Sequence, residues 1–430
     1  MAVRFPGSRN PKHYFPVTKK QSKVVFGWAG KSRWYITGLD QLIVDIEVHD
    51  QDGLVTEMGL APGESILVDG EKAQRLLQQI SDPKFVFARS AGGSVGNTLN
   101  NFTFLSGEPA VLLGTINESI RPGDPAFHYV AQTSKAVDLA YLVERRGSLA
   151  TAVTFISKNG ERSFAVTPGI CNDYPAEQLP VRVIQESAAV VTSLYCLRDP
   201  AWPIARAAER LMALASEAAI PVALGMGTAG LVRERRQAAQ ELLARYVTIA
   251  AMNVAEAEAL TGEKDALLSC QRVLDWVDLV IITEGPRGLT MGGYVDEQFR
   301  RETEQEIRSK AIPEYNRWEY SRLMRRGDCQ TPQKIYTHIH PYQGGPERLV
   351  NTNGAGDAAL AAVLHDIVAN RYHLATVPQC AKHPADIPFL SYSSLSRCAQ
   401  YGNRVAYDIL IGHSPRLDTA VGPDCALESV

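Results

Sequence analysis

The feature that most restricts the fold of this chain is a regular alternation of short apolar runs and longer amphipathic runs between residues 188 and 288. The short runs are rich in β-branched residues and predict buried strands: AAVVTSLY, IPVALGMG, VTIAAMN and VDLVIITEGPRG. The runs between them have helical spacing: IARAAERLMALASEA, RRQAAQELLARY and VAEAEALTG. Strands that alternate with helices predict an α/β fold, in which helices cover both faces of a mainly parallel sheet.

Segments outside this region continue the pattern. They predict a first strand at residues 34–48, a helix at 70–80, a buried strand at 109–116 and a hairpin at 150–169. An Asn159-Gly160 pair suits the tight turn of that hairpin. We therefore expect one large domain over residues 31–420, between a basic arm at 1–30 and a short tail at 421–430.

A charged segment, approximately residues 293–348, departs from the alternation and is too long for a simple loop. We expect an insertion with helices of its own. Its basic stretch RWEYSRLMRR is interrupted by Glu319, which favours a solvated or subunit-contacting face over a nucleic-acid patch. His338 and His340 would face the same way on a strand, but with no evident third ligand a metal site there is disfavoured.

Charge and composition exclude several classes of function. With 44 Lys and Arg against 47 Asp and Glu, the chain lacks the basic excess of a nucleic-acid binder. It has no apolar run long enough to span a membrane and no signal-peptide core near its start. Its seven cysteines are scattered without a Cys-x-x-Cys pair, which fits a reducing cytoplasm. We expect a cytoplasmic protein whose partners are small molecules, and the sequence is compatible with a homo-oligomer.

The stretch NTNGAGDAALAAVLHDI begins at Asn351 and has the pattern of an anion-binding helix start. Gly354, Ala355 and Gly356 would offer unpaired backbone N–H groups at the positive end of a helix dipole. Asp357 would repel that anion unless it takes a proton from a hydroxyl that attacks it, as in phosphoryl transfer. On this stretch alone, a helix-capping aspartate beside a simple turn is an equal alternative. A dinucleotide-binding G-x-G-x-x-A match is weaker, because too little of a mononucleotide-binding half follows it.

Three further stretches carry side chains that suit the same chemistry, although each is weak alone. AGGSVGN is a second glycine turn, NVAE places an amide and a carboxylate on one helical face where hydrated magnesium could be held, and TEGPRG is a glycine turn after a strand. Taken singly, each is more simply a turn or a surface feature. The chain has no G-x-x-x-x-G-K-[ST] and is therefore not a P-loop protein.

Together, and in this order from Gly38 to about Asn403, these pieces resemble the ribokinase and adenosine kinase family of carbohydrate and nucleoside kinases. The resemblance implies a doubly wound α/β kinase domain with a small discontinuous β lid, near residues 42–60 and 145–172. It implies Asp357 as the catalytic base, Gly354 to Gly356 as the anion hole, and ATP with Mg²⁺ as cofactors. The residues that it assigns to these cofactors are Asn253 and Glu256 near magnesium, and Asn253, Thr283, Gly285, Gly288 and Asn403 near ATP.

The stretch GLDQLIVDI looks like the part of adenosine kinases that holds the ribose hydroxyls. By this resemblance the nucleoside is held by Asp45, with Asp40, Gln41, Gly92, Gly93 and Asn97 beside it. ERSF matches the arginine of the lid, which assigns Arg162 to charge on the phosphates and makes Phe164 a candidate to pack on the base. A surface hairpin charge is the simpler alternative for Arg162.

The arm FPGSRNPKHYFPV, the stretch HIHPYQGGPERLVNTNGAGD and the terminal NRVAYDILIGHSPRL resemble the bacterial inosine-guanosine kinase branch of this family. That likeness implies phosphorylation of the 5′-hydroxyl of inosine or guanosine by ATP, in purine salvage. Arg198 is a candidate donor to the O6 of such a base, with a distant surface arginine equally open. Asn351 stands where the family has aspartate, which puts its nearby K⁺ site in doubt. An adenosine or sugar kinase, a non-catalytic nucleoside sensor and an NAD oxidoreductase remain alternatives.

Overall fold

The computed structural model describes residues 34–49, 59, 65–68, 70–80, 86–122, 124–156, 162–303, 311–384 and 387–417. The predicted arm at 1–30, the tail at 421–430 and the Asn159-Gly160 turn lie outside these residues. None of the described helices is long and apolar enough to cross a membrane. In the described part of the chain, Cys171, Cys196, Cys270, Cys329 and Cys380 are free thiols.

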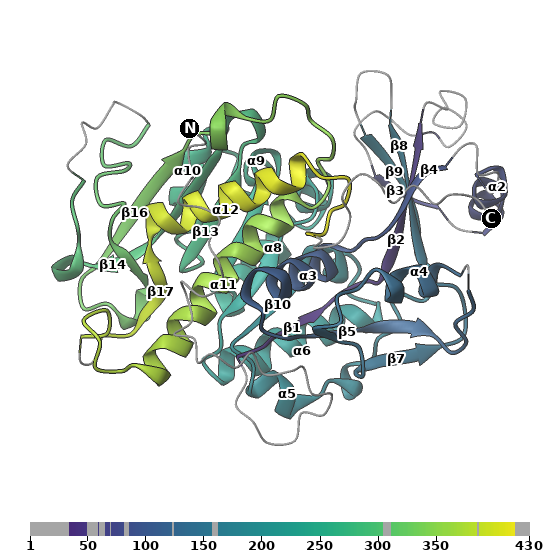
Figure 1. The fold of residues 1–430 in the computed structure, drawn as a ribbon, viewed down its shortest axis with the longest axis horizontal. Coiled ribbons are helices and arrows are strands. Elements are labelled where there is room, and N and C mark those ends of the chain that lie inside the picture. Colours follow the sequence, from purple (N-terminus) through teal and green to yellow (C-terminus); the bar gives the residue numbers. More distant parts are fainter. Residues whose placement is uncertain are drawn as a thin grey trace, which may run out of the picture.

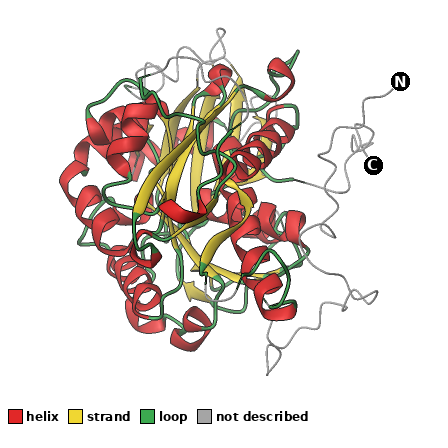
Figure 2. Ribbon diagram, turned by 90° about the vertical axis from the view of Figure 1, so that its left-hand side faces the viewer, coloured by secondary structure: helices red, strands yellow, loops and turns green. Residues whose placement is uncertain are grey.

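The centre of the molecule is a twelve-stranded sheet, as the alternation predicts (Figures 1 and 2). Its order is β17-β15-β14-β13-β12-β11-β10-β1-β5-β6, with β16 paired to β14 and β7 paired to β5. The parallel strands are β1 (Ile36–Leu39), β5 (Ala110–Asn117), β6 (Val137–Asp138), β7 (Leu142–Arg145), β10 (Ala189–Ser193), β11 (Val222–Gly225), β12 (Ile249–Asn253) and β13 (Leu279–Thr283). The antiparallel strands at one end are β14 (Leu289–Asp296), β15 (Arg322–Met324), β16 (Pro332–Ile339) and β17 (Phe389–Ser394).

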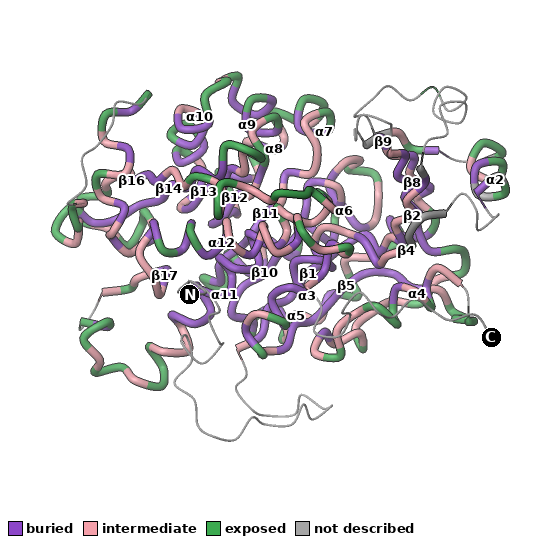
Figure 3. The backbone as a smooth tube through the Cα atoms, turned by 45° about the horizontal axis from the view of Figure 1, so that its top comes forward, coloured by how far each residue is buried: buried purple, intermediate pink, exposed green. Residues whose placement is uncertain are grey.

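Helices cover both faces of this sheet, which confirms the doubly wound α/β class. One face carries α3 (Ser94–Ser106), α11 (Ala355–Thr376) and α12 (Leu395–Leu410). The other carries α6 (Pro203–Glu217), α7 (Ala229–Glu234), α8 (Arg236–Tyr246), α9 (Val254–Thr261) and α10 (Ala266–Val273). Two apolar cores result, one on each face of the sheet, and Figure 3 shows the buried backbone that runs through both. The smaller helices are α2 (Gly70–Gln79), α4 (Pro125–Ala131) and α5 (Val181–Gln185).

A second sheet of five strands stands at one end of the first (Figure 1). Its order is β3-β9-β8-β2-β4, with bounds Ser65–Leu67 (β3), Arg162–Thr167 (β9), Ala150–Ile156 (β8), Ile43–His49 (β2) and Val86–Ala91 (β4). Three of its strands fall in the two ranges expected for the lid, and β3 and β4 lie outside them. The single strand expected at 34–48 is wrong: the chain leaves one sheet after Leu39 and enters the other at Ile43. A continuous apolar run cannot show such a crossing, because both halves are buried.

The charged segment 293–348 differs from its prediction. Among its described residues, helical structure is limited to single 3-10 turns, while β15 and β16 join the main sheet. Glu319, expected on a solvated face, is buried and accepts a hydrogen bond of 2.7 Å from the Thr337 hydroxyl. Leu323 and Met324 beside it are buried in the cores. Because the segment is rich in charged residues, its sequence did not reveal β15, whose apolar residues Leu323 and Met324 are buried.

Candidate active site

The predicted site residues gather where the parallel strands of the main sheet end. The carboxyl ends of β1, β10, β12 and β13 lie at the same edge. Asp40 follows β1 and Tyr195 lies two residues after β10, while Asn253 and Thr283 are the last residues of β12 and β13. In open α/β sheets this edge is where ligands bind. Because β2 follows β1 after three residues, the second sheet stands beside the same edge (Figure 1).

Asp357 lies in the first turn of α11, where two side chains from α3 donate hydrogen bonds to it. The hydroxyl of Ser94 donates to its Oδ1 at 2.5 Å, and Nδ2 of Asn97 donates to its Oδ2 at 3.1 Å. The residue that caps the helix is Gly354, with no side-chain bond to the helix start. The capping alternative for Asp357 is therefore wrong.

The glycine turn before α11 requires its glycine. Gly354 has φ of 81°, a left-handed conformation, and a Cβ there would lie 2.7 Å from the carbonyl oxygen of Pro415. Ala355 and Gly356 follow as the first helical residues, so their N–H groups are among those that a helix leaves unpaired. No described strand leads directly into this turn, which removes the dinucleotide-binding alternative.

A second glycine turn, between β4 and α3, lies against two carboxylates. A Cβ on Gly92 would collide with the carboxylate of Asp45, and one on Gly93, where φ is 84°, would lie 2.5 Å from Oδ2 of Asp40. The N–H of Gly96 donates to that same Asp40 oxygen at 2.7 Å. The structure therefore brings Asp40, Asp45, Gly92 and Gly93 together, beside the helix that holds Asp357.

Three carboxyl groups at this edge have raised pKa values. Burial raises the pKa of Asp357 to about 6, against the lowering effect of the Ser94 and Asn97 hydrogen bonds. Burial also raises the pKa of Asp40 to about 7 and that of Glu256 to about 8, and in both cases the charge of Asp357 adds to the rise. At neutral pH Asp357 is ionised and free to accept a proton, whereas Glu256 retains its own.

Asn253 and Glu256 are held by each other. The Glu256 carboxylate accepts from the Asn253 N–H at 2.9 Å and from Nδ2 at 2.7 Å, while the Glu256 N–H donates back to Oδ1 at 2.9 Å. This is a capping box at the start of α9. The charge of Asp357 raises the pKa of both Glu256 and Asp40, so a cation bound near Asp357 would relieve that repulsion, and the oxygen donors of Asn253 and Glu256 fit Mg²⁺. Among the described residues, no group of three or more His, Cys, Asp or Glu has metal-binding geometry by itself.

The TEGPRG stretch forms a tight turn between β13 and β14. The Glu284 N–H donates to the carbonyl of Gly288 at 2.8 Å, and both Gly285 and Gly288 have positive φ. A Cβ on Gly288 would collide with the carbonyl of Ile339, at the end of β16. Asn403 of α12 donates to the carbonyl of His340 at 2.7 Å, so α12 is tied to the same place.

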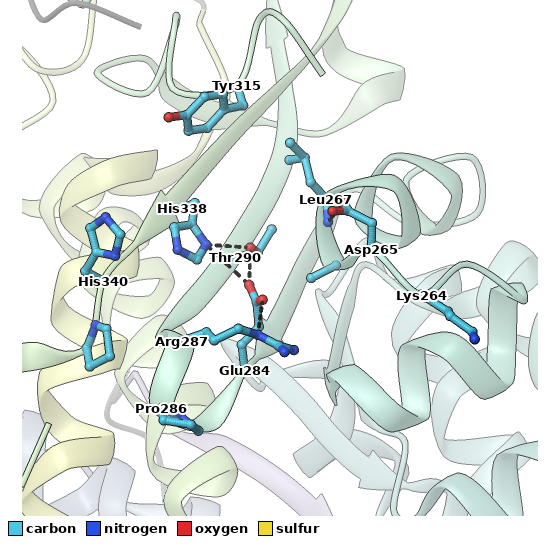
Figure 4. A pocket seen from close by; sticks show the side chains of 12 residues that line it. Lys264, Asp265, Leu267, Glu284, Pro286, Arg287, Thr290, Tyr315, His338 and His340 are labelled. Atoms are coloured by element: carbon cyan, nitrogen blue, oxygen red, sulfur yellow. Dashed lines mark hydrogen bonds and ion pairs between the residues drawn. The ribbon is translucent and has the colours of Figure 1, made fainter. Parts of the chain in front are cut away.

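A cavity of about 600 Å³ opens beside this turn (Figure 4). Inside it, the Thr290 hydroxyl donates to Glu284 at 2.5 Å and Nδ1 of His338 lies 3.3 Å from the same oxygen. Burial would raise the pKa of Glu284, but the bonds from His338 and Thr290 outweigh burial and hold it below its usual value. The cavity is also lined by Lys264, Asp265, Arg287, Tyr315 and His340.

Arg198 lies at the sheet edge, directly after the 3-10 turn that follows β10. Its Nε is buried and has no hydrogen-bond partner among the described residues. Its charge lowers the pKa of the neighbouring Tyr195, which burial and the charge of Glu256 raise. The alternative of a distant surface arginine is therefore wrong.

The remaining predicted residues are less directly placed at this edge. The amide of Gln41 is buried and donates to Oδ1 of Asn172 at 2.5 Å, so it is turned toward that segment. Phe164 lies in β9, separated from β2 by β8. Arg162 begins β9 opposite Ile156, and its side chain lies outside the described part of the structure. Asn351 is buried, and its Oδ1 accepts the N–H of Asn353 at 2.9 Å.

The sequence reasoning gave no role at this site to four residues that contribute to it: Ser94, Glu284, His338 and Arg416. Ser94 was inside a quoted motif but was assigned no role, and Glu284 with His338 were separated by a long charged segment. Arg416, beyond the last helix, donates to Asn97 at 3.0 Å and to the carbonyl of Gly92 at 3.1 Å. No local pattern marks these contacts, because they join residues far apart in the chain.

Comparison with known proteins agrees with this geometry. The model of the "pfkB family carbohydrate kinase" family matches residues 124–306. The guanosine-inosine kinase of Escherichia coli (strain K12) is 42% identical over 418 residues, which cover 96% of each chain. The chain belongs to the guanosine-inosine kinase family. As a member of this family, the chain is an ATP-dependent phosphotransferase. Its relatives share the doubly wound α/β fold.

Solved structures show the same fold at low identity. The adenosine kinase from Sinorhizobium meliloti has a TM-score of 0.65 at 19% identity, covering 90% of this kinase and 96% of that chain. The adenosine kinase from Schistosoma mansoni in complex with 2-fluoroadenosine has a TM-score of 0.64 at 15% identity, covering 90% and 98%. The fold of the kinase is thus that of adenosine kinases.

Proposed function

We propose that the protein transfers the γ-phosphoryl group of ATP to the 5′-hydroxyl of guanosine or inosine, giving GMP or IMP in purine salvage. One observation supports this above the others. Asp357 is ionised at neutral pH, lies at the start of a helix behind a glycine turn, and receives hydrogen bonds from the helix that follows the second glycine turn. This arrangement supports a role for Asp357 as a general base between a site for an anion and a site for an alcohol.

The residues around Asp357 form what we call the acceptor half of the site: Asp40, Asp45, Gly92, Gly93, Ser94, Asn97 and Asp357. Carboxylates beside a turn that lacks Cβ atoms suit the closely spaced hydroxyls of a ribose. With the sugar held there, Asp357 takes the proton of the 5′-hydroxyl as it attacks. Gly354, Ala355 and Gly356 then donate backbone N–H groups to the charge that develops on the transferred phosphoryl group. Arg162 adds positive charge from the second sheet.

A donor half consists of Asn253, Glu256, the turn Thr283–Gly288 and Asn403. We propose that Thr283, Gly285, Gly288 and Asn403 border the ATP, where backbone can approach the nucleotide closely. Asn253 and Glu256 hold Mg²⁺ through water, and the ion when bound neutralises phosphate charge. Glu256 must lose its proton for this role.

The base is selected by groups that pair with a 6-oxopurine. Inosine and guanosine present an O6 acceptor and an N1–H donor, the reverse of adenosine. Arg198 is the proposed donor to O6, because its buried Nε at the sheet edge has no hydrogen-bond partner in the part of the chain that the structure describes. Phe164 is proposed to pack against the ring. A site that leaves buried groups unpaired can reject the wrong base by up to roughly 10⁴–10⁵ in kcat/KM.

The test is ADP release from ATP, measured for the purified protein with guanosine, inosine, adenosine, ribose and fructose as separate acceptors. We expect turnover with guanosine and inosine, and a much lower kcat/KM with adenosine. Equal values for adenosine and inosine would contradict the base preference. Turnover with a free sugar alone would assign the protein to another branch of the fold, and no turnover with any acceptor would favour a nucleoside sensor. Arg198→Ala, with Arg397→Ala as a surface control, should remove the preference.

A further inference from the structure

The chain beyond α12 returns to the acceptor half of the site. Residues 411–417 lie over α3, where the N–H of Leu417 donates to Oδ1 of Asn101 at 2.7 Å and Nδ2 of Asn101 donates to the carbonyl of Pro415 at 3.3 Å. Pro415 in turn packs against the turn at Gly354. The residue between these anchors, Arg416, is therefore directed to one place.

The guanidinium of Arg416 is buried, with 5% of the residue exposed, and every nitrogen has a partner. Its Nε donates to Oδ1 of Asn97 at 3.0 Å and Nη2 donates to the carbonyl of Gly92 at 3.1 Å. Its Nη1 donates to the Thr133 hydroxyl at 3.0 Å and to the carbonyl of Gln132 at 3.3 Å. The guanidinium carbon also lies 5.1 Å from the centre of the Tyr129 ring. A buried charge with so many directed bonds holds its neighbours in one arrangement.

We propose that Arg416 is a positioning residue for phosphoryl transfer: it orients the amide of Asn97 toward the catalytic base and holds the Gly92 turn against the nucleoside. The inference rests on the proposed function, since it concerns the same site. It assigns a role to Arg416, which lies in the terminal stretch NRVAYDILIGHSPRL but received no role from the sequence.

The orientation of Asn97 follows from the chemistry of its two neighbours. A guanidinium can only donate hydrogen bonds, so it requires the carbonyl oxygen of the Asn97 amide. The NH₂ group must then face the other way, where it donates to Oδ2 of Asp357 at 3.1 Å. The reversed amide would place N–H against N–H on one side and oxygen against carboxylate on the other. Arg416 thus selects the one orientation in which Asn97 supports Asp357.

Arg416 also places a fixed positive charge near the carboxylates. It lowers the pKa of both Asp357 and Asp40, which burial raises. The other groups that act on this cluster are Ser94 and Asn97 from α3, Glu256 from α9 and Tyr195 after β10. Loss of the guanidinium should therefore both loosen the amide and raise the pH at which the base ionises.

The experiment compares Arg416→Ala, Arg416→Gln and Arg416→Lys with Arg397→Ala, an exposed arginine of α12 that contacts the side chain of Gln400 at 3.5 Å. The measurements are kcat, KM for the nucleoside, KM for ATP, the pH profile of kcat/KM and Tm. We expect Arg416→Ala to lower kcat/KM for the nucleoside by about a hundredfold, the cost of a small misplacement of reacting groups. Its acidic limb should move to higher pH, while KM for ATP stays within about twofold.

The lysine variant separates charge from geometry. Lysine keeps the positive charge but cannot bridge Asn97, Gly92 and Thr133 as a planar fork. We therefore expect its acidic limb to return toward that of the unchanged protein, while KM for the nucleoside remains raised. If Arg416→Ala does not fold, the glutamine and lysine variants carry the same test. A loss of Tm in all folded variants, with an unchanged pH profile and unchanged nucleoside KM, would show that Arg416 only stabilises the fold and would overturn the proposal.

Failure of this inference is distinguishable from failure of the proposed function. The unchanged protein is first assayed on the panel of acceptors, which tests the function. The Arg416 variants are then compared on whichever acceptor is phosphorylated. A protein that phosphorylates none of them, but binds guanosine, still allows the nucleoside dissociation constants to be compared, and equal constants for Arg416→Ala and Arg397→Ala would overturn the inference.

Discussion

The two halves of the site are held together in different ways. In the acceptor half the hydrogen bonds join distant segments: Asp357 to Asn97, 260 residues apart, and Arg416 to Gly92, 324 residues apart. In the donor half the contacts are mostly local, such as the Asn253–Glu256 pair, three residues apart, and the Thr290–Glu284 bond, six residues apart. The acceptor half therefore exists only when the whole domain has folded, whereas much of the donor half is formed by a single turn and a single helix start.

The two halves also differ in how the charges of their carboxyl groups are compensated. The acceptor half brings Asp40 and Asp357 into one partly enclosed space, and Arg416 is the cation that offsets them. In the donor half the two carboxyl groups differ: burial would raise the pKa of Glu284, but the bonds from His338 and Thr290 hold it below its usual value, whereas burial raises the pKa of Glu256 to about 8. We expect substitutions in the acceptor half to alter both catalysis and stability, and substitutions in the donor half to alter mainly the response to metal and nucleotide.

The largest effect is expected for Asp357→Asn. The amide keeps the size of the side chain and can still bond Ser94 and Asn97, but it cannot take a proton. We expect kcat to fall by roughly 10²–10⁴-fold, as for other general bases, while guanosine and ATP still bind. The measurement is steady-state kcat with a binding titration for each ligand. A variant with near-normal kcat would show that Asp357 is not the base.

The pH dependence of the unchanged protein should reflect ionisation of the same base, Asp357. Because the pKa of Asp357 is about 6, the base is ionised above that pH and protonated below it. We expect kcat/KM to fall as the pH drops through about 6. An acidic limb that persists unchanged in Asp357→Asn would belong to another group.

The next effect concerns stability, where the acceptor half should show the cost of its buried charge. Asp40 is 2% exposed and its pKa is raised from 3.8 to about 7, so its ionised form destabilises the folded protein as the pH rises from about 4 to 7. Asp40→Asn keeps an acceptor for the Gly96 N–H and removes that cost. We expect the variant to be more stable by about 2–4 kcal/mol at pH 8, since each pKa unit corresponds to about 1.4 kcal/mol.

The check is Tm of Asp40→Asn and of the unchanged protein at pH 8 and at pH 4.5. The gain should be several degrees at the higher pH and small at the lower one, where both forms of the protein carry a neutral group. Activity should be lost at the same time, because the nucleoside site loses a carboxylate. A variant less stable than the unchanged protein at pH 8 would mean that Asp40 is compensated by more than Gly96 and Arg416.

A smaller effect is expected in the donor half from Glu256→Gln. At neutral pH the Glu256 carboxyl is protonated without metal, since its pKa is about 8, so the substitution should change Tm little. The capacity to become a carboxylate is lost, and we expect the Mg²⁺ concentration for half-maximal activity to rise by about tenfold. An unchanged magnesium response would leave the Asn253–Glu256 pair as a capping box alone.

The difference between local and long-range contacts also determines what could be predicted from the sequence. The alternation of strands and helices predicted the fold class. The site residues assigned at the sheet edge came from the resemblance to the kinase family, which rests on local motifs. Arg416 escaped notice because its partners lie on α3 and in the Gly92 turn, more than 280 residues away. Residues 293–348 were misjudged for a related reason: the apolar side of β15 is short, and its burial depends on β14 and β17.

The smallest effect is expected at Asn351, next to the glycine turn that precedes α11. Asparagine offers a carbonyl oxygen but no formal charge, so the electrostatic part of its attraction for a monovalent cation is reduced. In this structure that oxygen accepts the Asn353 N–H, and the backbone N–H of Asn351 donates to the carbonyl of Leu410 at 3.2 Å. Backbone carbonyls near the turn can supply further ligands for K⁺.

We therefore expect activation by K⁺ that requires a higher concentration than in Asn351→Asp, by a few-fold. Binding of the cation would stiffen the turn that presents Gly354 to Gly356 to the phosphoryl group, so kcat should respond more than KM. The measurement is kcat across K⁺ concentrations, with a bulky organic cation keeping the ionic strength constant. If K⁺ changes neither protein, asparagine marks the loss of the cation site. Pro415, which lies against Gly354, would then be left to hold the anion-binding turn in place.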